Sequence, residues 1–262
     1  PGRAGRRARR RRPPAGLMQA VPAPAGTSSI KVGTDRWLVR RKRGGFGFPV
    51  FIWNSWNRMI HLHYIDDALL VAEKPAGLLS VPGRSAENQD CVVARLQALY
   101  PDALTVHRLD QVTSGLLLHA RGKDMQAALS MQFEQRQVGK RYEAVVQGVI
   151  ESDAGEVDLP LIVDWPNRPK QMVDHERGKP ALTRWRVLVR DVEARRTRVA
   201  LEPITGRSHQ LRLHMATIGH PIVGDVLYDA APAHRVHLHA RSLRFTHPLT
   251  GEVLAFESAA PF

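Results

Sequence analysis

From Met59 to the last residue, short apolar runs bounded by turn residues recur without a regular alternation of strands and helices. Short runs rich in Leu and Val are typical of buried strands. The runs that we interpret as strands are 67–73, 105–109, 115–120, 142–146, 182–189, 197–201, 236–245 and 253–256. Many strands with few helices predict an α+β fold, with one domain over 59–262 built on a mixed, largely antiparallel β-sheet flanked by helices and loops.

Three segments repeat apolar residues at helical spacing and are predicted to be helices: 90–100, 123–137 and 207–218. In the first of them, Asp90 is the expected N-cap, because its side chain can accept a hydrogen bond from a free backbone N–H. Pro101 is expected to end that helix.

The net charge of +13 comes entirely from the first part of the chain. Residues 1–58 hold 14 Lys and Arg and one acid, Asp35, whereas the other 24 basic and 24 acidic residues of 59–262 balance. Any positive surface on the predicted domain must therefore arise from segregation of charge onto one face.

The segment 1–58 is rich in Arg, Pro, Ala and Gly, and we expect it to be a disordered extension. Three interpretations stay open: a basic tail that grips RNA, a transit peptide, or an over-extended start, which we favour because Met59 opens the well-patterned part. The segment shows no pattern of an S4 RNA-binding domain.

Cysteine content and hydropathy exclude several classes of protein. The single cysteine, Cys91, permits neither a disulfide framework nor a cysteine zinc site within one chain. No apolar run approaches the ~18 residues that span a bilayer. We therefore expect no membrane partner and a reducing, cytoplasmic location.

Asp110 stands next to an apolar run, in the stretch TVHRLDQVTSG at 105–115. It is either a cap at a strand edge or a carboxylate held in a pocket for chemistry. Burial raises the pKa of a carboxyl by up to ~3–5 units and an adjacent Arg lowers it by ~1–3, so a pocket requires a guanidinium. Arg108 is one candidate. Arg207 is the better one, because it follows a glycine turn at a predicted helix start, where anions are favoured. The spacing alone favours a surface ion pair over this pairing, because most Arg-Asp pairs are surface ion pairs.

The motif HRLDxxTSG at 107–115 resembles the catalytic motif of the RluA family of pseudouridine synthases. The other landmarks of that family follow in order: KPAGLLSVPGR at 74–84, KRYEAVVQG at 140–148, PITGRSHQLRLHMATIGHPIVGD at 203–225 and HLHARSLRFTHPLTG at 237–251. DWPNRPKQ at 164–171 and GKPALT at 178–183 resemble the branch of the family that modifies both 23S rRNA and tRNA. The resemblance covers 62–262 and implies the pseudouridine synthase fold.

The resemblance implies an RNA-modifying isomerase that needs no cofactor. Asp110 would be the nucleophile, attacking either C1′ of the ribose or C6 of the uracil. Arg207 would pair with that carboxylate, Tyr142 would pack on the uracil and could help to remove the C5 proton, and Arg108 would occupy the gap left by the flipped nucleotide. The expected RNA-binding residues are His107, Arg108, Leu109, Arg168, His209 and Gln210. The substrates would be a 23S rRNA hairpin and a tRNA anticodon stem-loop, and the protein would act as a monomer.

Other functions are open on the residues alone. A metal hydrolase could use His209 and His214, or His237 and His239, but His209 and His214 are five apart and lack the glutamate of HExxH, so we expect no metal site. A non-catalytic RNA-binding or refolding module would keep the same fold. An N-glycosidase would need a second carboxylate across the bond, and no motif marks one.

Overall fold

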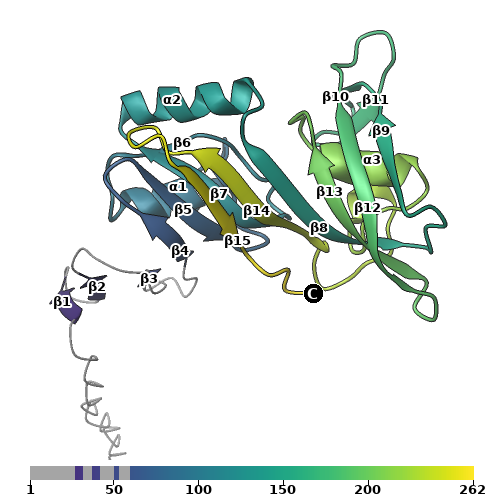
Figure 1. The fold of residues 1–262 in the computed structure, drawn as a ribbon. Coiled ribbons are helices and arrows are strands. Elements are labelled where there is room, and N and C mark those ends of the chain that lie inside the picture. The colour runs from purple at the N-terminus through teal and green to yellow at the C-terminus, as the bar shows by residue number, and fades with distance from the viewer. Residues whose placement is uncertain (1–26, 32–36, 42–49, 53–59) are drawn as a thin grey trace, which may run out of the picture.

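The computed structural model describes residues 27–31, 37–41, 50–52 and 60–262 (Figure 1). Three short strands fall in the basic segment 1–58: β1 (Thr27–Lys31), β2 (Trp37–Arg41) and β3 (Val50–Ile52). The other residues of that segment lie outside the described part, so the disorder expected for them stays a prediction.

A long twisted sheet organises the described residues. Its strands run in the order β3, β4 (Ile60–Ile65), β5 (Leu69–Lys74), β7 (Ser114–Arg121), β14 (Leu238–Thr246), β8 (Gly139–Gln147), β13 (Arg196–Pro203), β12 (Leu182–Asp191) and β9 (Ala154–Asp158). Two more strands join from the side: β15 (Val253–Glu257) pairs with β14, and β6 (Ala103–Thr105) pairs with β7. A separate hairpin consists of β10 (Leu161–Val163) and β11 (Gln171–Val173). The pairing of β7 with β14 is parallel and the other pairs are antiparallel, which confirms the predicted mixed sheet.

The parallel contact between β7 and β14 lies inside the sheet, and Gly115 makes it possible. Gly115 pairs with Ala240 and has φ of +113°. A Cβ atom at this position would lie 2.4 Å from the carbonyl oxygen of Ala240. Only glycine permits both the positive φ and this close approach of the two backbones.

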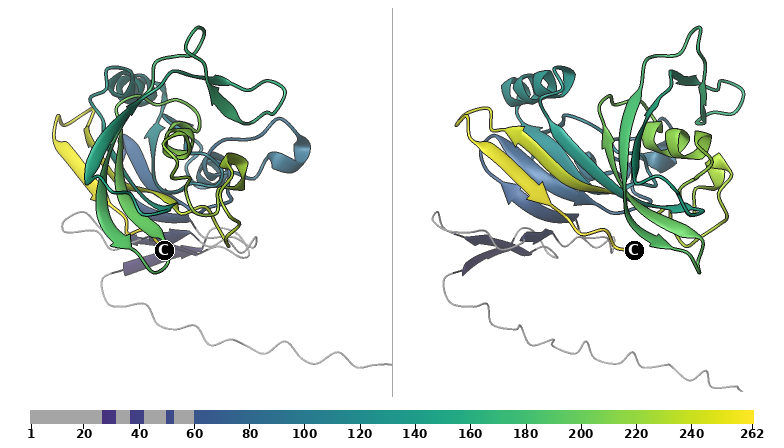
Figure 2. Two further views of the ribbon diagram at one scale, coloured as in Figure 1. Left: turned by 90° about the vertical axis from the view of Figure 1, so that its right-hand side faces the viewer. Right: turned by 45° about the vertical axis from the view of Figure 1, so that its right-hand side comes forward.

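The helices pack on different parts of the sheet, and the strand β8 crosses from one half of the sheet to the other (Figures 1 and 2). The helix α2 (Lys123–Glu134) packs on β7, where Leu129 joins a core cluster with Val71 and Leu118. The helix α3 (Gln210–Thr217) packs on β12 and β13 and contributes Leu211 and Met215 to a second cluster. The shorter elements are α1 (Val92–Gln97) and the 3₁₀ turns η1 (Ala86–Asn88) and η2 (Val226–Tyr228).

Most predicted elements exist, but three details were wrong. The predicted strand 105–109 ends at Thr105, and 106–110 form a loop. Cys91 occupies the N-cap position of α1, while Asp90 instead accepts a hydrogen bond of 2.6 Å from Arg95. The helix predicted at 207–218 begins three residues later, at Gln210. Among the described residues, no helix is long and apolar enough to cross a membrane.

Candidate functional site

Asp110 lies in the loop between β6 and β7, and contacts to its neighbours fix this loop. The Ser80 hydroxyl donates to the carbonyl of Leu109 (2.8 Å) and accepts from its N–H (3.1 Å). On the other side of Asp110, the carbonyl of Gln111 accepts from the Gly77 N–H (2.8 Å) and from the Lys74 ammonium (2.9 Å). Both flanking residues are thus tied to the segment 74–80, and the carboxylate of Asp110 is held at the surface of a cleft with its side chain 27 % exposed.

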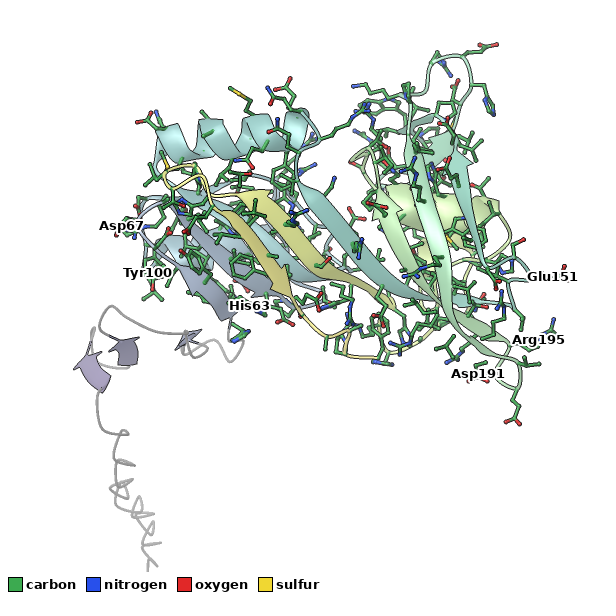
Figure 3. The ribbon with its side chains drawn as sticks, in the orientation of Figure 1. His63, Asp67, Tyr100, Glu151, Asp191 and Arg195 are labelled. Carbon is green, nitrogen blue, oxygen red and sulfur yellow. The ribbon has the colours of Figure 1, made fainter. Side chains whose placement is uncertain are left out.

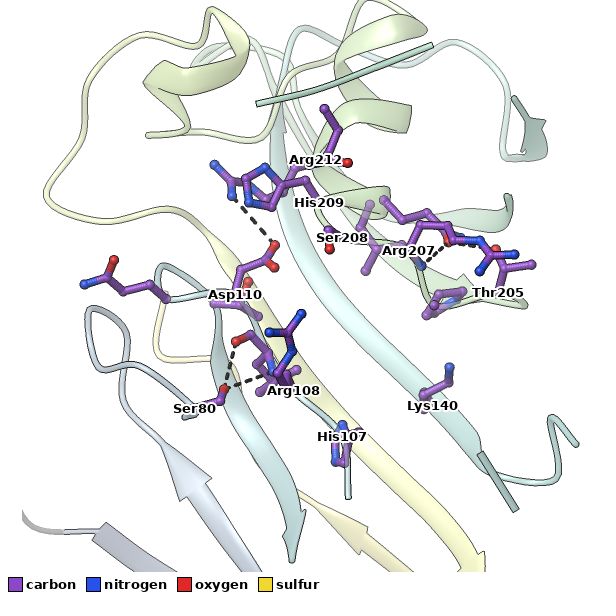
Figure 4. A pocket seen from close by; sticks show the side chains of 18 of the residues that line it. Ser80, His107, Arg108, Asp110, Lys140, Thr205, Arg207, Ser208, His209 and Arg212 are labelled. Carbon is purple, nitrogen blue, oxygen red and sulfur yellow. Dashed lines mark hydrogen bonds and ion pairs between the residues drawn. The ribbon is translucent and has the colours of Figure 1, made fainter. Parts of the chain in front are cut away.

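The guanidinium that faces Asp110 belongs to Arg212, not to Arg207. Arg212 Nη1 lies 3.7 Å from Asp110 Oδ2 (Figure 4). The opposite edge of the same guanidinium donates to both oxygens of Asp225, with Nε–Oδ2 at 2.6 Å and Nη2–Oδ1 at 2.7 Å. The side chains of Arg212 and Asp225 are only 5 % and 2 % exposed. The buried bidentate pair therefore orients the positive charge toward Asp110.

The pairing of Arg207 with Asp110 was predicted wrongly because the helix begins later than its sequence pattern suggested. Arg207 lies before α3, is exposed, and donates from Nε to the carbonyl of Pro180 (3.1 Å). Gln210 holds this turn, because its side-chain oxygen accepts from the Arg207 N–H (3.0 Å) and from the Thr205 hydroxyl (2.7 Å). Arg212 lies within the first turns of α3 and reaches the loop of Asp110 from there.

Two aromatic side chains lie beside the Asp110–Arg212 pair. Tyr142 on β8 lines the cleft and packs against the core. Burial and the charge of Asp110 raise the pKa of Tyr142, so its hydroxyl stays protonated at neutral pH. Tyr228 lies under the guanidinium of Arg212, with 5.2 Å between Cζ and the ring centre, and its hydroxyl is 2.9 Å from Nδ1 of His209.

All six residues predicted to bind RNA line the cleft, and three of them also make contacts inside the protein. Leu109 is 7 % exposed and belongs to the core cluster that includes Leu62. His107 accepts a hydrogen bond from the Leu118 N–H (3.0 Å), and burial lowers its pKa to about 3, so that its ring is neutral. Gln210 is 3 % exposed, and its side-chain amide forms hydrogen bonds to the turn before α3 and to β12. These side chains thus form part of the wall of the cleft.

The other three predicted RNA-binding residues present more of their side chains to the cleft. Arg108 is exposed next to Asp110. Arg168, on the loop between β10 and β11, stacks on Trp165 with 4.3 Å between Cζ and the ring centre. His209 lies near Asp110, and burial lowers its pKa, an effect that the charge of Asp110 partly offsets.

The cleft encloses about 1430 Å³ and is strongly basic, although residues 59–262 carry no net charge. Its acidic lining side chains are Asp110 and Glu134. Its basic lining side chains are Arg84, Arg108, Arg136, Lys140, Arg168, Arg207 and Arg212. Charge is thus segregated onto this face, which is the arrangement that a polyanionic ligand requires.

Sequence reasoning missed the residues that support Asp110 from behind. Lys74 is fully buried, and its ammonium donates to three carbonyls, those of Pro75 (3.0 Å), Leu78 (2.7 Å) and Gln111 (2.9 Å). The sequence did contain a signal for these residues. Lys74, in the Lys-Pro-Ala-Gly turn, and Asp225, in the Gly-Asp pair at 224–225, are charged residues at the ends of apolar runs.

The histidines considered as metal ligands make contacts within the protein. His214 lies 2.9 Å from the Thr183 hydroxyl, and His239 contacts the hydroxyls of Ser114 (2.8 Å) and Ser258 (3.0 Å). His237 stacks on Phe262. Both ring nitrogens of His214 and of His239 thus contact groups of the protein itself.

Comparisons with known proteins identify the family of this chain. A family model described as RNA pseudouridylate synthase matches residues 68–217. The dual-specificity RNA pseudouridine synthase RluA of Vibrio cholerae is 54 % identical over 194 residues, which cover 72 % of this chain and 78 % of the relative. The RluA protein of Escherichia coli is 50 % identical over 203 residues, covering 76 % and 92 %.

Solved structures with the same fold include two human proteins. Human RNA Pseudouridylate Synthase Domain Containing 1 has a TM-score of 0.65 at 27 % identity, over 78 % of this chain and 84 % of that one. Human RNA Pseudouridylate Synthase Domain Containing 4 has a TM-score of 0.62 at 27 % identity, over 76 % and 88 %. A family model that matches more than half of the sequence and relatives at about half identity establish that the chain belongs to the RNA pseudouridylate synthase family.

Proposed function

We propose that this protein isomerises uridine to pseudouridine in structured RNA, with Asp110 as the nucleophile. The observation that carries the proposal is the placement of the Asp110 carboxylate in a basic cleft, 3.7 Å from a guanidinium that is itself held by a buried carboxylate. Seven Lys and Arg side chains against two acidic ones give the cleft the positive charge that attracts RNA phosphates.

The reaction conserves all atoms of the nucleoside. Asp110 forms a bond to C1′ or to C6, the N1–C1′ bond breaks, and the uracil turns so that C5 bonds to C1′. The proton on C5 is lost, N1 gains one, and the carboxylate is released. Isomerisation therefore needs no redox partner and consumes no water.

The proposed roles of the neighbouring residues follow from their positions. Arg212 stabilises the charge on Asp110 before and after the covalent step. Tyr142 packs on the uracil, and its raised pKa argues against a phenolate acting as the base for the C5 proton. Arg108 fills the space that the flipped nucleotide leaves, because the reacting atoms are inaccessible within a stack.

The substrates that we propose are a 23S rRNA hairpin and a tRNA anticodon stem-loop, acted on in the cytoplasm by a monomer. The RluA proteins of V. cholerae and E. coli, described as dual-specificity RNA pseudouridine synthases, support a substrate set of this kind. Loops suit the site, because single-stranded bases can be splayed out and stacked on aromatic or guanidinium groups.

Asp110→Asn tests the proposal directly. We expect the variant to bind a tRNA stem-loop within a few-fold of the wild type but to yield no pseudouridine by carbodiimide mapping. Asp124→Asn, at an exposed position of α2 outside the cleft, is the matched control and keeps full activity. Pseudouridine formation by Asp110→Asn would contradict the role of Asp110 as the nucleophile. Release of free uracil by the wild type would favour an N-glycosidase.

A further inference from the structure

Two histidines and a glutamate meet at the end of the sheet, away from the catalytic cleft. His61 and His63 lie two apart on β4, and Glu73 lies on the neighbouring strand β5, where it is the register partner of His61. The register shifts between Leu62 and Tyr64, which places His63 beside Glu73 as well. Figure 3 shows His63 at the lower rim of the sheet.

The ligand atoms of the three side chains are close together. His63 Nε2 lies 2.8 Å from Glu73 Oε2, and His61 Nδ1 lies 3.6 Å from the same oxygen. The two imidazole rings meet edge to face with their centres 4.5 Å apart. Within the part of the chain that the structure describes, these three side chains bring their ligand atoms within 4.8 Å of one another.

These spacings match a tetrahedral ion. Zn²⁺ is bound by imidazole nitrogen and carboxylate oxygen at ~2.0–2.2 Å, so two ligand atoms of one tetrahedral ion are ~3.3–3.5 Å apart. The 3.6 Å separation needs almost no change, and the 2.8 Å hydrogen bond would lengthen by roughly half an ångström as the ion replaced the shared proton. Side-chain rotation alone can supply a shift of this size.

The surroundings suit a bound cation. Glu73 also has a hydrogen bond to the Ser258 hydroxyl, which in turn contacts the buried His239. Buried partners of this kind orient a ligating carboxylate and raise metal affinity. The hydrogen bond from His63 is the main cause that lowers the pKa of Glu73 to about 2, so the carboxylate is charged. Burial lowers the pKa of His61, which favours the neutral imidazole that a metal requires.

Access is also available, because the side chains of His61, His63 and Glu73 are 28 %, 17 % and 32 % exposed. Three protein ligands on two rigid strands leave a fourth position free for water. Mixed imidazole and carboxylate ligands select Zn²⁺ and similar transition metals over Mg²⁺ or Ca²⁺, which prefer all-oxygen sites.

We propose that His61, His63 and Glu73 form a binding site for one Zn²⁺ ion, or a divalent transition metal of similar preference, that clamps β4 to β5. The site plays no part in the isomerisation, and none of its ligands lines the cleft. Its effect is on the fold: an ion that binds the native state alone stabilises it by mass action. Glu73 directly precedes Lys74, whose ammonium donates to the carbonyl of Gln111 in the Asp110 loop. The bound ion would therefore also stabilise the end of β5 that carries Lys74.

The test uses the full chain, stripped with a chelator and dialysed, with Zn²⁺ alone as the probe. Equilibrium dialysis should find one Zn²⁺ per chain, and Co²⁺ in its place should give the strong visible absorption of a four-coordinate ion. Removing one ligand, by His63→Ala or by the near-isosteric Glu73→Gln, should weaken Zn²⁺ binding by more than ~100-fold. His175→Ala, at an exposed histidine outside the cluster, should bind Zn²⁺ like the wild type.

The outcomes separate cleanly. Absence of stoichiometric Zn²⁺ binding in the wild type would overturn the proposal, as would unchanged binding in Glu73→Gln. Because this substitution preserves the size of the side chain, circular dichroism should show a native fold, and His61→Ala provides a second ligand deletion if His63→Ala fails to fold. Pseudouridine formation by the stripped wild type is expected to persist, which keeps this test independent of the catalytic one.

Discussion

Arg212 donates two hydrogen bonds, of 2.6 and 2.7 Å, to the buried carboxylate of Asp225, and this pair directs the rest of the guanidinium toward the catalytic cleft. Arginine can hold one carboxylate with two of its nitrogens and present the third to another, because its donors form a rigid planar fork. The site thus depends on the carboxylate of Asp225, which does not line the cleft.

Asp225→Asn should destabilise the protein by ~3–5 kcal/mol, because it leaves a buried guanidinium without its charged partner. Urea unfolding followed by circular dichroism measures the change. Glu156→Gln breaks the ion pair between Glu156 and Arg184, whose side chains are 54 % and 55 % exposed respectively. This substitution should lower the free energy of unfolding by less than ~1 kcal/mol. Equal costs for the two variants would contradict the account of Arg212 as a buried, anchored charge.

Arg212→Lys should lower kcat by at least ~100-fold, since lysine cannot hold Asp225 with two donors and also face Asp110. Arg207→Lys should change kcat by less than ~10-fold, because Arg207 contacts the carbonyl of Pro180 rather than Asp110. Single-turnover formation of pseudouridine in a tRNA stem-loop measures both. The reverse ranking would return the catalytic guanidinium to position 207.

The hydroxyl of Tyr142 should not titrate within the working range of the enzyme. Burial raises its pKa above the ordinary value of 10.0, so the phenol stays protonated as pH rises through 8 to 10. The pH–rate profiles of the wild type and Tyr142→Phe should therefore have the same shape over this range, whatever their heights. A rise in rate near pH 10 that vanishes in Tyr142→Phe would show that a phenolate takes part.

Lys74 should make stability depend on pH. Burial lowers its pKa from 10.5 to about 7 in the folded protein, although the charge of Asp110 opposes this. Between these values the unfolded chain binds the extra proton, so the contribution of Lys74 to stability rises with pH from about 7 to 10.5 and is flat outside that window.

Lys74→Met removes this titration. The free energy of unfolding of the wild type, measured relative to that of Lys74→Met, should therefore increase from pH 7 to pH 10 on the order of a few kcal/mol. Lys123→Met, at an exposed position of α2, serves as control and should give no such slope. A constant difference at all pH values would mean that the Lys74 ammonium stays charged in the fold.

Arg168 should contribute a phosphate contact rather than base recognition. Arg168→Ala is expected to weaken binding of all RNA hairpins to a similar extent and to reduce the slope of log affinity against log salt by ~1. Filter binding between low and physiological salt measures the slope. Arg186→Ala, at an exposed site of β12 outside the cleft, should leave it unchanged.

The sequence by itself determined the α+β class, the strands and their apolar faces, and the importance of the loop around Asp110. These properties are local, because the spacing of apolar residues follows the period of each element. The motifs also placed Asp110, Tyr142 and Arg108 at one cleft, since they match a family pattern.

Only the tertiary structure decided which guanidinium faces Asp110. Arg207 lies before the start of α3 and Arg212 lies within it, so only Arg212 reaches the Asp110 loop. It also showed that His107, Leu109 and Gln210 make internal contacts in the wall of the cleft, and that Lys74 and Asp225 hold the site from behind. Neither the cross-strand meeting of His61, His63 and Glu73 nor the basic cleft of a neutral domain could be predicted from spacing. Both depend on strand register and on the packing of distant segments, which the periodicity of a sequence does not encode.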